Sequence, residues 1–203
     1  MIASCDVDSL LPFIRHKLAE DYRLNTTHPT DLPGRKAAVL VPFCCRDGKL
    51  QVIFTRRTEL VLDHKGQVAF PGGAMEPEDA DTTVTALREC FEEIGIPPEE
   101  VDILGKMKDY WTISNFVISP VIGLTKWRDH FETSPNEVSR VFSVPVDFLT
   151  DVKNIEVERR TLPNGMDSKL FYYAKYDGEI VWGITARIAV RLMKALDWLP
   201  RDL

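Results

Sequence analysis

The sequence predicts an α/β (α+β) protein in which helices cover both sides of a mixed β-sheet. Helical periodicity near both ends of the chain, a tight-turn signal between two strand-like runs, and one helix with clear start and stop residues support this fold class. The chain has 203 residues, of which 44% are hydrophobic, enough for the core of one domain. We expect 1–203 to form that domain, with a core at 35–198 after an N-terminal helix and connecting segment at 1–34.

The first predicted elements are a helix and a hairpin. Leu10, Ile14 and Leu18 recur at helical spacing. This spacing predicts an amphipathic helix over 8–22. Strand-like runs on both sides of the RDG stretch at 46–48 predict a hairpin, because Asp-Gly tolerates positive φ.

The rest of the chain predicts strands interrupted by one internal helix. Asp81 can cap the start of this helix, and Gly95 can end it in a left-handed conformation. Pro145 can begin a short helical turn within 144–149. The other expected elements are strands at 101–110 and 116–125, a second hairpin from 155–165 and 168–179 around Asn164 and Gly165, and a final amphipathic helix over 183–199.

Charge and hydropathy argue against two classes of partner. A formal net charge of −6 does not suit a protein that binds nucleic acid through a general basic surface. No apolar run approaches the ~20 residues of a membrane span, and the first residues lack the pattern of a signal peptide. We therefore expect a cytoplasmic protein with no nucleic-acid or membrane partner.

The cysteines do not form a zinc-binding pattern. They lack CxxC spacing and paired histidines. We expect all four to be reduced thiols: Cys5, Cys44, Cys45 and Cys90.

Three glutamates gather in the second half of the internal helix. Glu89, Glu92 and Glu93 stand at i, i+3 and i+4 and share one face, while an apolar face can be buried. Each acid near a helix C-terminus is unfavourable by roughly 0.3 to 1 kcal/mol. Such oxygen ligands suit Mg²⁺ or Mn²⁺, and Arg88 can hold a carboxylate in a fixed orientation. The alternative is an ordinary acidic helix face in water.

The stretch RECFEEIGI, preceded by a Gly-Gly loop, resembles the signature of the Nudix hydrolases. This resemblance implies an α/β/α sandwich with a mixed β-sheet and metal-dependent hydrolysis of nucleoside diphosphates linked to another group. It implies that Glu89, Glu92 and Glu93 bind the metal and that Arg88 orients them. The carbonyl of the loop glycine, Gly73, is then expected close to the metal.

The spacing before Arg88 departs from the common signature. The interval from Gly73 to Arg88 is one residue longer, and Ala80 stands where a glutamate is usual. Three nearby acids could take the place of that glutamate: Glu78, Asp79 and Asp81.

A second stretch, FTRRTELVLDHKGQVAFPGGAME at 54–76, resembles the additional motif of the coenzyme A diphosphatase branch of this family. That branch shares the longer spacing, although Leu62 stands where an arginine is expected. Basic and amide side chains here are natural phosphate partners, and a solvated surface role is the alternative. Phe70, like Trp182, is either a core residue or a surface that stacks on a base or pantetheine. The substrate-binding candidates are Arg57, His64, Lys65, Gln67, Phe70, Gly72 and Gly73.

The leading functional hypothesis is a metal-dependent coenzyme A diphosphatase that releases adenosine 3′,5′-bisphosphate and 4′-phosphopantetheine. Glu137 is the candidate base or extra ligand, the alternative being a loop glutamate in water. Two other functions stay open: a Nudix diphosphatase for ADP-ribose, nucleotide sugars or dinucleotides, and a catalytically silent module that binds a nucleotide or a protein. The expected partner is a small-molecule nucleoside diphosphate derivative, and a homodimer stays open. The catalytic candidates are Arg88, Glu89, Glu92, Glu93 and Glu137.

Overall fold

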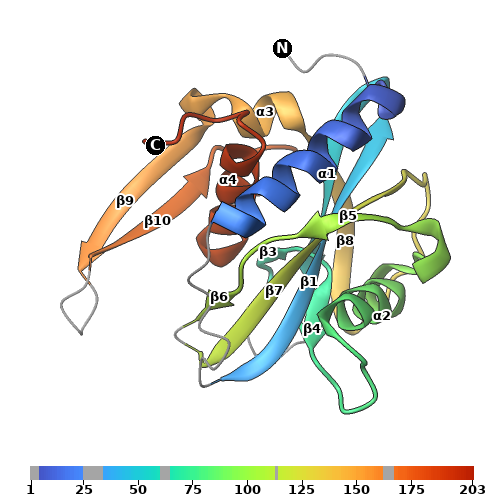
Figure 1. The fold of residues 1–203 in the computed structure, drawn as a ribbon. Helices are drawn as coiled ribbons and strands as arrows, with labels where there is room; N and C mark the ends of the chain where they lie inside the picture. Colours follow the sequence, from blue (N-terminus) through green and yellow to red (C-terminus); the bar gives the residue numbers. More distant parts are fainter. Residues whose placement is uncertain (1–4, 25–33, 60–64, 113, 162–166) are drawn as a thin grey trace.

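The computed structural model describes residues 5–24, 34–59, 65–112, 114–161 and 167–203. An eight-stranded sheet stands at its centre, and a two-stranded sheet lies beside it (Figure 1). The elements are α1 (Val7–Leu24), β1 (Arg35–Arg46), β2 (Lys49–Arg57), β3 (Val68–Ala69), β4 (Gly72–Ala74), α2 (Thr82–Ile94), η1 (Pro98–Glu100), β5 (Asp102–Lys106), β6 (Tyr110–Trp111), β7 (Phe116–Lys126), β8 (Val138–Pro145), α3 (Val146–Thr150), η2 (Val152–Asn154), β9 (Ile155–Thr161), β10 (Asp167–Tyr173) and α4 (Gly183–Ala195).

The central sheet is built around β1, which has three partner strands. β1 runs parallel to β7 along almost its whole length. On its other edge, its first half pairs with β4 and its second half with β2, both antiparallel. β2 also pairs with β3 and β8, and β7 with β5 and β6. The predicted mixed sheet is confirmed, and the change of partner along β1 brings the glycine loop of β4 beside its first half.

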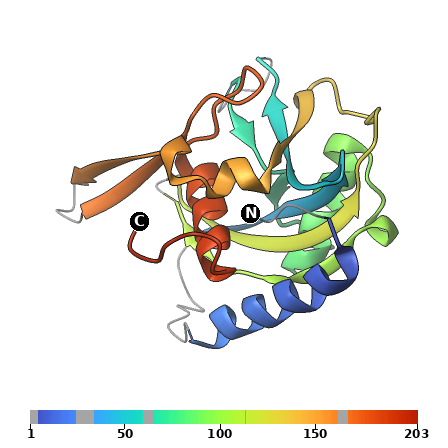
Figure 2. The same ribbon diagram turned by 90° about the horizontal axis from the view of Figure 1, so that it is seen from above.

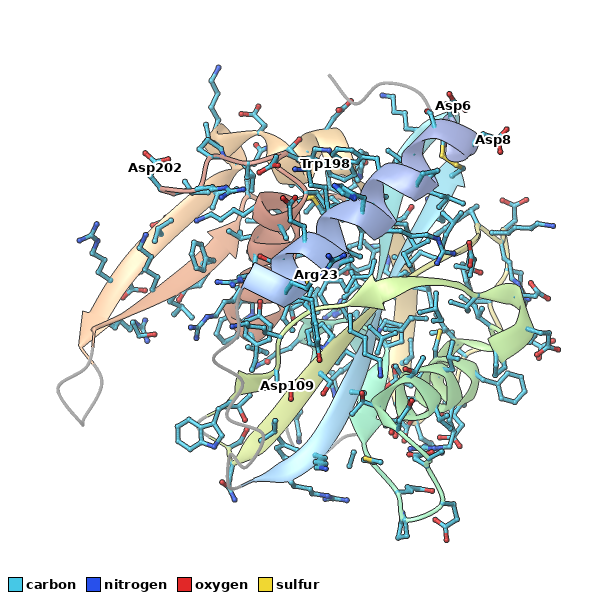
Figure 3. The ribbon with its side chains drawn as sticks, in the orientation of Figure 1. Asp6, Asp8, Arg23, Asp109, Trp198 and Asp202 are labelled. Carbon is cyan, nitrogen blue, oxygen red and sulfur yellow. A yellow bond between two sulfur atoms is a disulfide. The ribbon has the colours of Figure 1, made fainter. Side chains whose placement is uncertain are left out.

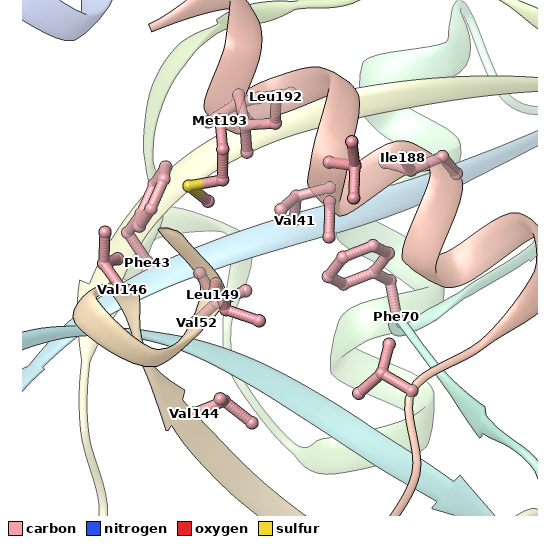
Figure 4. Close-up of a cluster of buried hydrophobic side chains, with 14 of the residues drawn as sticks. Val41, Phe43, Val52, Phe70, Val144, Val146, Leu149, Ile188, Leu192 and Met193 are labelled. Atoms are coloured by element: carbon pink, nitrogen blue, oxygen red, sulfur yellow. The ribbon is translucent and has the colours of Figure 1, made fainter. Parts of the chain in front are cut away.

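Helices cover both faces of this sheet. Ala38, Leu40 and Cys44 of β1 belong to a small core under α2. Val41 and Phe43 point to the opposite face, into a larger core shared with α1, α3 and α4 (Figure 4). This alternation follows from the period of two in a strand. The predicted α/β/α sandwich is therefore confirmed, while β9 and β10 project together from it (Figure 2).

Local signals placed α2 correctly. The Asp81 carboxylate accepts hydrogen bonds from the backbone N–H groups of Thr83 at 2.6 Å and Val84 at 3.1 Å, which is an N-cap. Gly95 ends the helix with φ of 69°, and its N–H donates to the carbonyl of Phe91. Both predicted ends of the internal helix are confirmed.

The other predicted elements are found, and the structure adds β3, β4, β8, η1 and η2. The hairpin of β1 and β2, the strands β5 and β7, the turn α3 and the helices α1 and α4 all form. Three elements end earlier than predicted: β5 at Lys106, β10 at Tyr173 and α4 at Ala195. β8 was not predicted, because its burial does not alternate along the strand. Asn164 and Gly165 lie outside the described residues. Among the described helices, none is long and apolar enough to cross a membrane.

The structure corrects the prediction that all four cysteines are reduced. Cys5, before α1, and Cys45, near the end of β1, form a disulfide with their Cα atoms 5.9 Å apart (Figure 3). Cys44 and Cys90 are free and buried. The two bonded residues are 40 positions apart, so no local spacing pattern signals their pairing.

Replacing Cys5 with serine should lower the free energy of unfolding by up to about 4 kcal/mol, because the cross-link closes a long loop in the unfolded chain. Urea unfolding without reductant measures this difference. With a reductant present, the wild type and Cys5→Ser should unfold at the same urea concentration. Equal midpoints without reductant would contradict the disulfide.

Candidate active site

Arg88 is the hub of the acidic cluster on α2. Its Nε and Nη2 donate to the two carboxylate oxygens of Asp79 at 3.1 and 3.0 Å. Its Nη1 donates to Glu89 at 3.1 Å and to Glu92 at 2.9 Å. Nη2 also donates to the carbonyl oxygen of Ala74 at 3.1 Å. All five N–H donors of the guanidinium therefore have acceptors, and the side chain is fixed in one orientation.

Of the three acids that could pair with Arg88, the structure selects Asp79. Its carboxylate is buried and also accepts hydrogen bonds from the backbone N–H of Glu76 at 2.9 Å and the hydroxyl of Thr85 at 3.0 Å. The hydrogen bonds from Arg88, more than any other contact, hold the pKa of Asp79 well below its usual range. Asp81 instead caps the helix. Asp79 thus joins the loop before α2 to the hub.

Glu93 is the buried carboxylate of the cluster, with 4% of the residue exposed. One oxygen accepts a hydrogen bond from the backbone N–H of Gly72 at 3.4 Å, and the other lies 3.8 Å from Nη1 of Arg57. Burial raises the pKa of Glu93 to about 8. The charge of Arg57 acts against this shift, whereas the charges of Glu89 and Glu137 add to it. Glu93 is therefore the group that would gain most from a bound cation.

Glu89 lies directly against the glycine loop. A Cβ atom at Gly73 would stand 2.5 Å from the Glu89 carboxylate, so a larger residue there would displace it. Burial raises the pKa of Glu89, and the neighbouring charge of Arg88 opposes the rise. Glu92 differs from both, because 53% of its side chain is exposed while Arg88 holds it. The three predicted glutamates thus occupy three different environments.

The loop that carries Glu137 is joined to the cluster by backbone hydrogen bonds. The N–H of Ser134 donates to the carbonyl of Glu93 at 3.0 Å. The N–H of Thr58 donates to the carbonyl of Glu137 at 2.9 Å. The charge of Glu137 contributes to the raised pKa values of both Glu89 and Glu93. The structure therefore brings Glu137 together with the helix glutamates; its role as base or ligand stays a prediction.

The chemistry of these donors fits a hard divalent cation, although they are not assembled as a ligand set. Burial raises the pKa values of Glu89 and Glu93, so a bound cation would favour their charged forms. Within the described residues, no three Asp, Glu, His or Cys side chains are placed to hold a metal ion together. Arg88 contacts Oε1 of Glu89, so a metal ion could bind Oε2 while that hydrogen bond is kept. The predicted contact from the carbonyl of Gly73 stays a prediction.

The substrate-binding candidates before the loop occupy unequal positions. The Nε of Arg57 is buried without a hydrogen-bond partner in the described part of the chain. The backbone N–H of Arg57 donates to the carbonyl of Gln67 at 2.9 Å, which joins the two ends of this segment. Lys65 is exposed and Gln67 is half-buried. His64 lies outside the described residues.

Phe70 is a core residue, which is one of the two alternatives considered for it, and its proposed contact with substrate has no support from this position. It is 3% exposed and stacks on Phe54, with ring centroids 4.8 Å apart. Both rings belong to the larger core cluster, in which Figure 4 labels Phe70. A large aromatic side chain is stabilised more by this burial than by a place at the surface.

Known proteins resemble this chain in sequence and in fold. Residues 34–164 match the family model described as NUDIX domain. A protein named Uncharacterized Nudix hydrolase NudL from Pectobacterium atrosepticum is 38% identical over 161 residues, covering 78% of this chain and 81% of that protein. One of the same name from Photorhabdus laumondii is 35% identical over 162 residues, covering 78% and 83%. The solved Nudix hydrolase RenU of M. smegmatis is similar in fold, with a TM-score of 0.53, 17% identity, and 82% and 88% coverage.

Replacing Asp79 with asparagine should weaken the hydrogen bonds that hold the guanidinium of Arg88. We expect a loss of about 1 to 3 kcal/mol in the free energy of unfolding at neutral pH, because asparagine has no charge and only one oxygen to accept the two hydrogen bonds from Arg88. Turnover should fall about tenfold or more, as when a residue that orients ligands is lost. The exposed neighbour Glu78, changed to Gln, is the matched control and should alter neither quantity.

The stabilisation that Asp79 contributes to the folded chain should depend on pH. The pKa of Asp79 is lowered in the folded chain, so its stabilisation is present above the unfolded pKa of about 4 and is lost as the pH falls further. The stability difference between wild type and Asp79→Asn should therefore shrink in acid. If Asp79→Asn has wild-type stability and turnover at neutral pH, Asp79 does not hold Arg88 in the way we assign to it.

Glu93 should give the metal-free protein the opposite pH dependence. Between about pH 4 and pH 8 its carboxyl holds a proton in the folded chain but not in the unfolded one. The free energy of unfolding should therefore fall as the pH rises through this window. Glu93→Gln cannot ionise, so its profile in EDTA should be flatter and should lie above the wild type near pH 8. Parallel profiles would mean that Glu93 ionises normally.

Proposed function

Because this chain belongs to the Nudix hydrolase family, whose members cleave phosphorus anhydrides, we propose that its substrate is coenzyme A or a derivative. The products would be adenosine 3′,5′-bisphosphate and 4′-phosphopantetheine. One observation carries the proposal: the segment that resembles the coenzyme A motif lies against the acidic cluster. Arg57 is 3.8 Å from Glu93, and Thr58 is bonded to Glu137 through the backbone.

The proposed chemistry is attack of water on one phosphorus of the diphosphate. A bound Mg²⁺ or Mn²⁺ would offset phosphate charge and lower the pKa of the attacking water. Glu89, Glu92 and Glu93 are the proposed ligands, together with the carbonyl of Gly73. Arg88 keeps Glu89 and Glu92 oriented through its hydrogen bonds. The charge of Glu137, on another loop, acts on both Glu89 and Glu93. Glu137 is the proposed proton acceptor or additional ligand.

Arg57 and Lys65 support recognition of the phosphate-rich nucleotide end. A buried donor without an acceptor is costly, and an anionic group beside the Nε of Arg57 would remove that cost. Lys65 presents an exposed positive charge two residues from the backbone contact between Arg57 and Gln67. These groups are the proposed phosphate contacts in a chain that has Leu62 where the related motif has arginine.

A substrate panel tests the proposal directly. Purified protein is incubated with Mg²⁺ and coenzyme A, dephospho-coenzyme A, ADP-ribose or NADH, and the products are identified by mass. We expect the two coenzyme A fragments, and no turnover in EDTA. If the protein cleaves ADP-ribose but neither form of coenzyme A, its substrate is ADP-ribose and the proposal is wrong. A folded protein that cleaves nothing would support a silent binding module.

Arg57→Ala should raise KM for coenzyme A about tenfold, with a smaller effect on kcat, because a binding contact is lost. Arg57 also lowers the pKa of Glu93, so the acidic limb of the kcat profile should move to higher pH. Arg159→Ala removes an exposed arginine of β9 and is the matched control. An unchanged KM in Arg57→Ala would contradict the assignment of Arg57 as a substrate contact.

A further inference from the structure

An exposed aromatic pair stands at the start of α4. Trp182 immediately precedes the helix and is 37% exposed. Its ring lies nearly parallel to that of Tyr172 in β10, with an interplanar angle of 6° and centroids 6.0 Å apart. The hydroxyl of Tyr172 lies 3.4 Å from a carboxylate oxygen of Glu158, at the surface. One side of the Trp182 ring is therefore supported while part of the ring remains open to solvent.

The first turn of α4, which follows Trp182, is joined to the segment that leads to the acidic cluster. The hydroxyl of Thr185, in the first turn of α4, donates to the carbonyl of Val68 in β3 at 3.1 Å. Val68 follows Gln67, whose carbonyl accepts the backbone N–H of Arg57. Arg57 in turn lies 3.8 Å from Glu93. A short series of contacts thus connects the start of α4 with the carboxylates.

The chain that carries Trp182 is held in place on two sides. Glu179 is a buried carboxylate, 3.2 Å from Nη1 of Arg140 and 3.7 Å from Nη1 of Arg56. The backbone N–H of Tyr173 donates to the carbonyl of Val181 at 2.8 Å. These contacts tie the chain to β8, β2 and β10. Such a supported ring needs little reordering when a ligand binds.

We propose that Trp182, supported by Tyr172, is the surface on which the adenine base of the substrate stacks, which makes Trp182 a specificity-determining residue. This inference rests on the proposed function. The adenine ring is the part of coenzyme A with a flat π-system, whereas the pantetheine arm is a flexible chain. Arg57, a proposed phosphate contact, is connected to the first turn of α4 through Gln67 and Val68. The base would therefore extend past these residues toward the start of α4.

Two variants separate stacking from a structural role. Trp182→Ala removes the ring, and Trp182→Phe keeps a smaller one. Trp111→Ala is the matched control, because Trp111 is a 49% exposed tryptophan in β6. Steady-state kinetics on coenzyme A give kcat and KM. Equilibrium titrations with adenosine 3′,5′-bisphosphate and with 4′-phosphopantetheine report on the two ends of the substrate separately.

For Trp182→Ala we expect about a tenfold or greater loss of affinity for adenosine 3′,5′-bisphosphate and a similar rise in KM, since base stacking is typically worth that much. Phosphopantetheine binding and kcat should change little, and Trp182→Phe should recover most of the affinity. Unchanged nucleotide binding by Trp182→Ala, or a loss confined to phosphopantetheine, would overturn the inference. So would failure of Trp182→Phe to recover affinity in a folded protein.

The failure of the proposed function would be visible separately. It fails if the wild type cleaves ADP-ribose and neither coenzyme A form. The same variants are then measured on ADP-ribose, which also carries adenine. A raised KM in Trp182→Ala would support base stacking in that case, and an unchanged KM would overturn it.

Discussion

The acidic end of α2 depends on the hydrogen bonds of one guanidinium. A helix C-terminus already carries negative partial charge, and three glutamates in its last two turns add to it. Arg88 offsets part of this charge by binding Glu89, Glu92 and the buried Asp79. Among the described residues, the cation next to Glu93 is Arg57 and not Arg88, and Glu93 is buried against the glycine loop. The result is a cluster stable enough to fold, yet still short of positive charge at one defined carboxylate.

The fold brings the remaining parts to this cluster mainly through backbone hydrogen bonds. Pairing of β4 with the first half of β1 fixes the glycine loop under Glu89. The backbone N–H of Ser134 donates a hydrogen bond to the carbonyl of Glu93. The backbone N–H of Thr58 donates one to the carbonyl of Glu137. These contacts do not use the side chains of Arg57 and Glu137. Substitutions there can change chemistry while the loops keep their positions.

Much of the fold and part of the site could be predicted from local sequence signals. Asp81 and Gly95 mark the ends of α2 because capping depends on only a few neighbouring residues. The shared face of the glutamates follows from helical periodicity. Asp79 could not be chosen from its neighbours, because its selection depends on how the loop folds back through the backbone N–H of Glu76. The pairing of Cys5 with Cys45 depends on contacts far apart in sequence, and the core position of Phe70 depends on tertiary packing.

The most direct test of this account is the number of protons released when the protein binds Mn²⁺ at pH 7. Calorimetric titrations in two buffers with different ionisation enthalpies give that number, for the wild type and for Glu93→Gln. With the pKa of Glu93 at about 8 in the free protein, the wild type should release about one proton per binding event, since metal ligands must be deprotonated. Glu93→Gln should release almost none and bind Mn²⁺ more weakly. Equal proton release and equal Mn²⁺ affinity in the two proteins would contradict the assignment of Glu93 as a metal ligand that is protonated in the free protein.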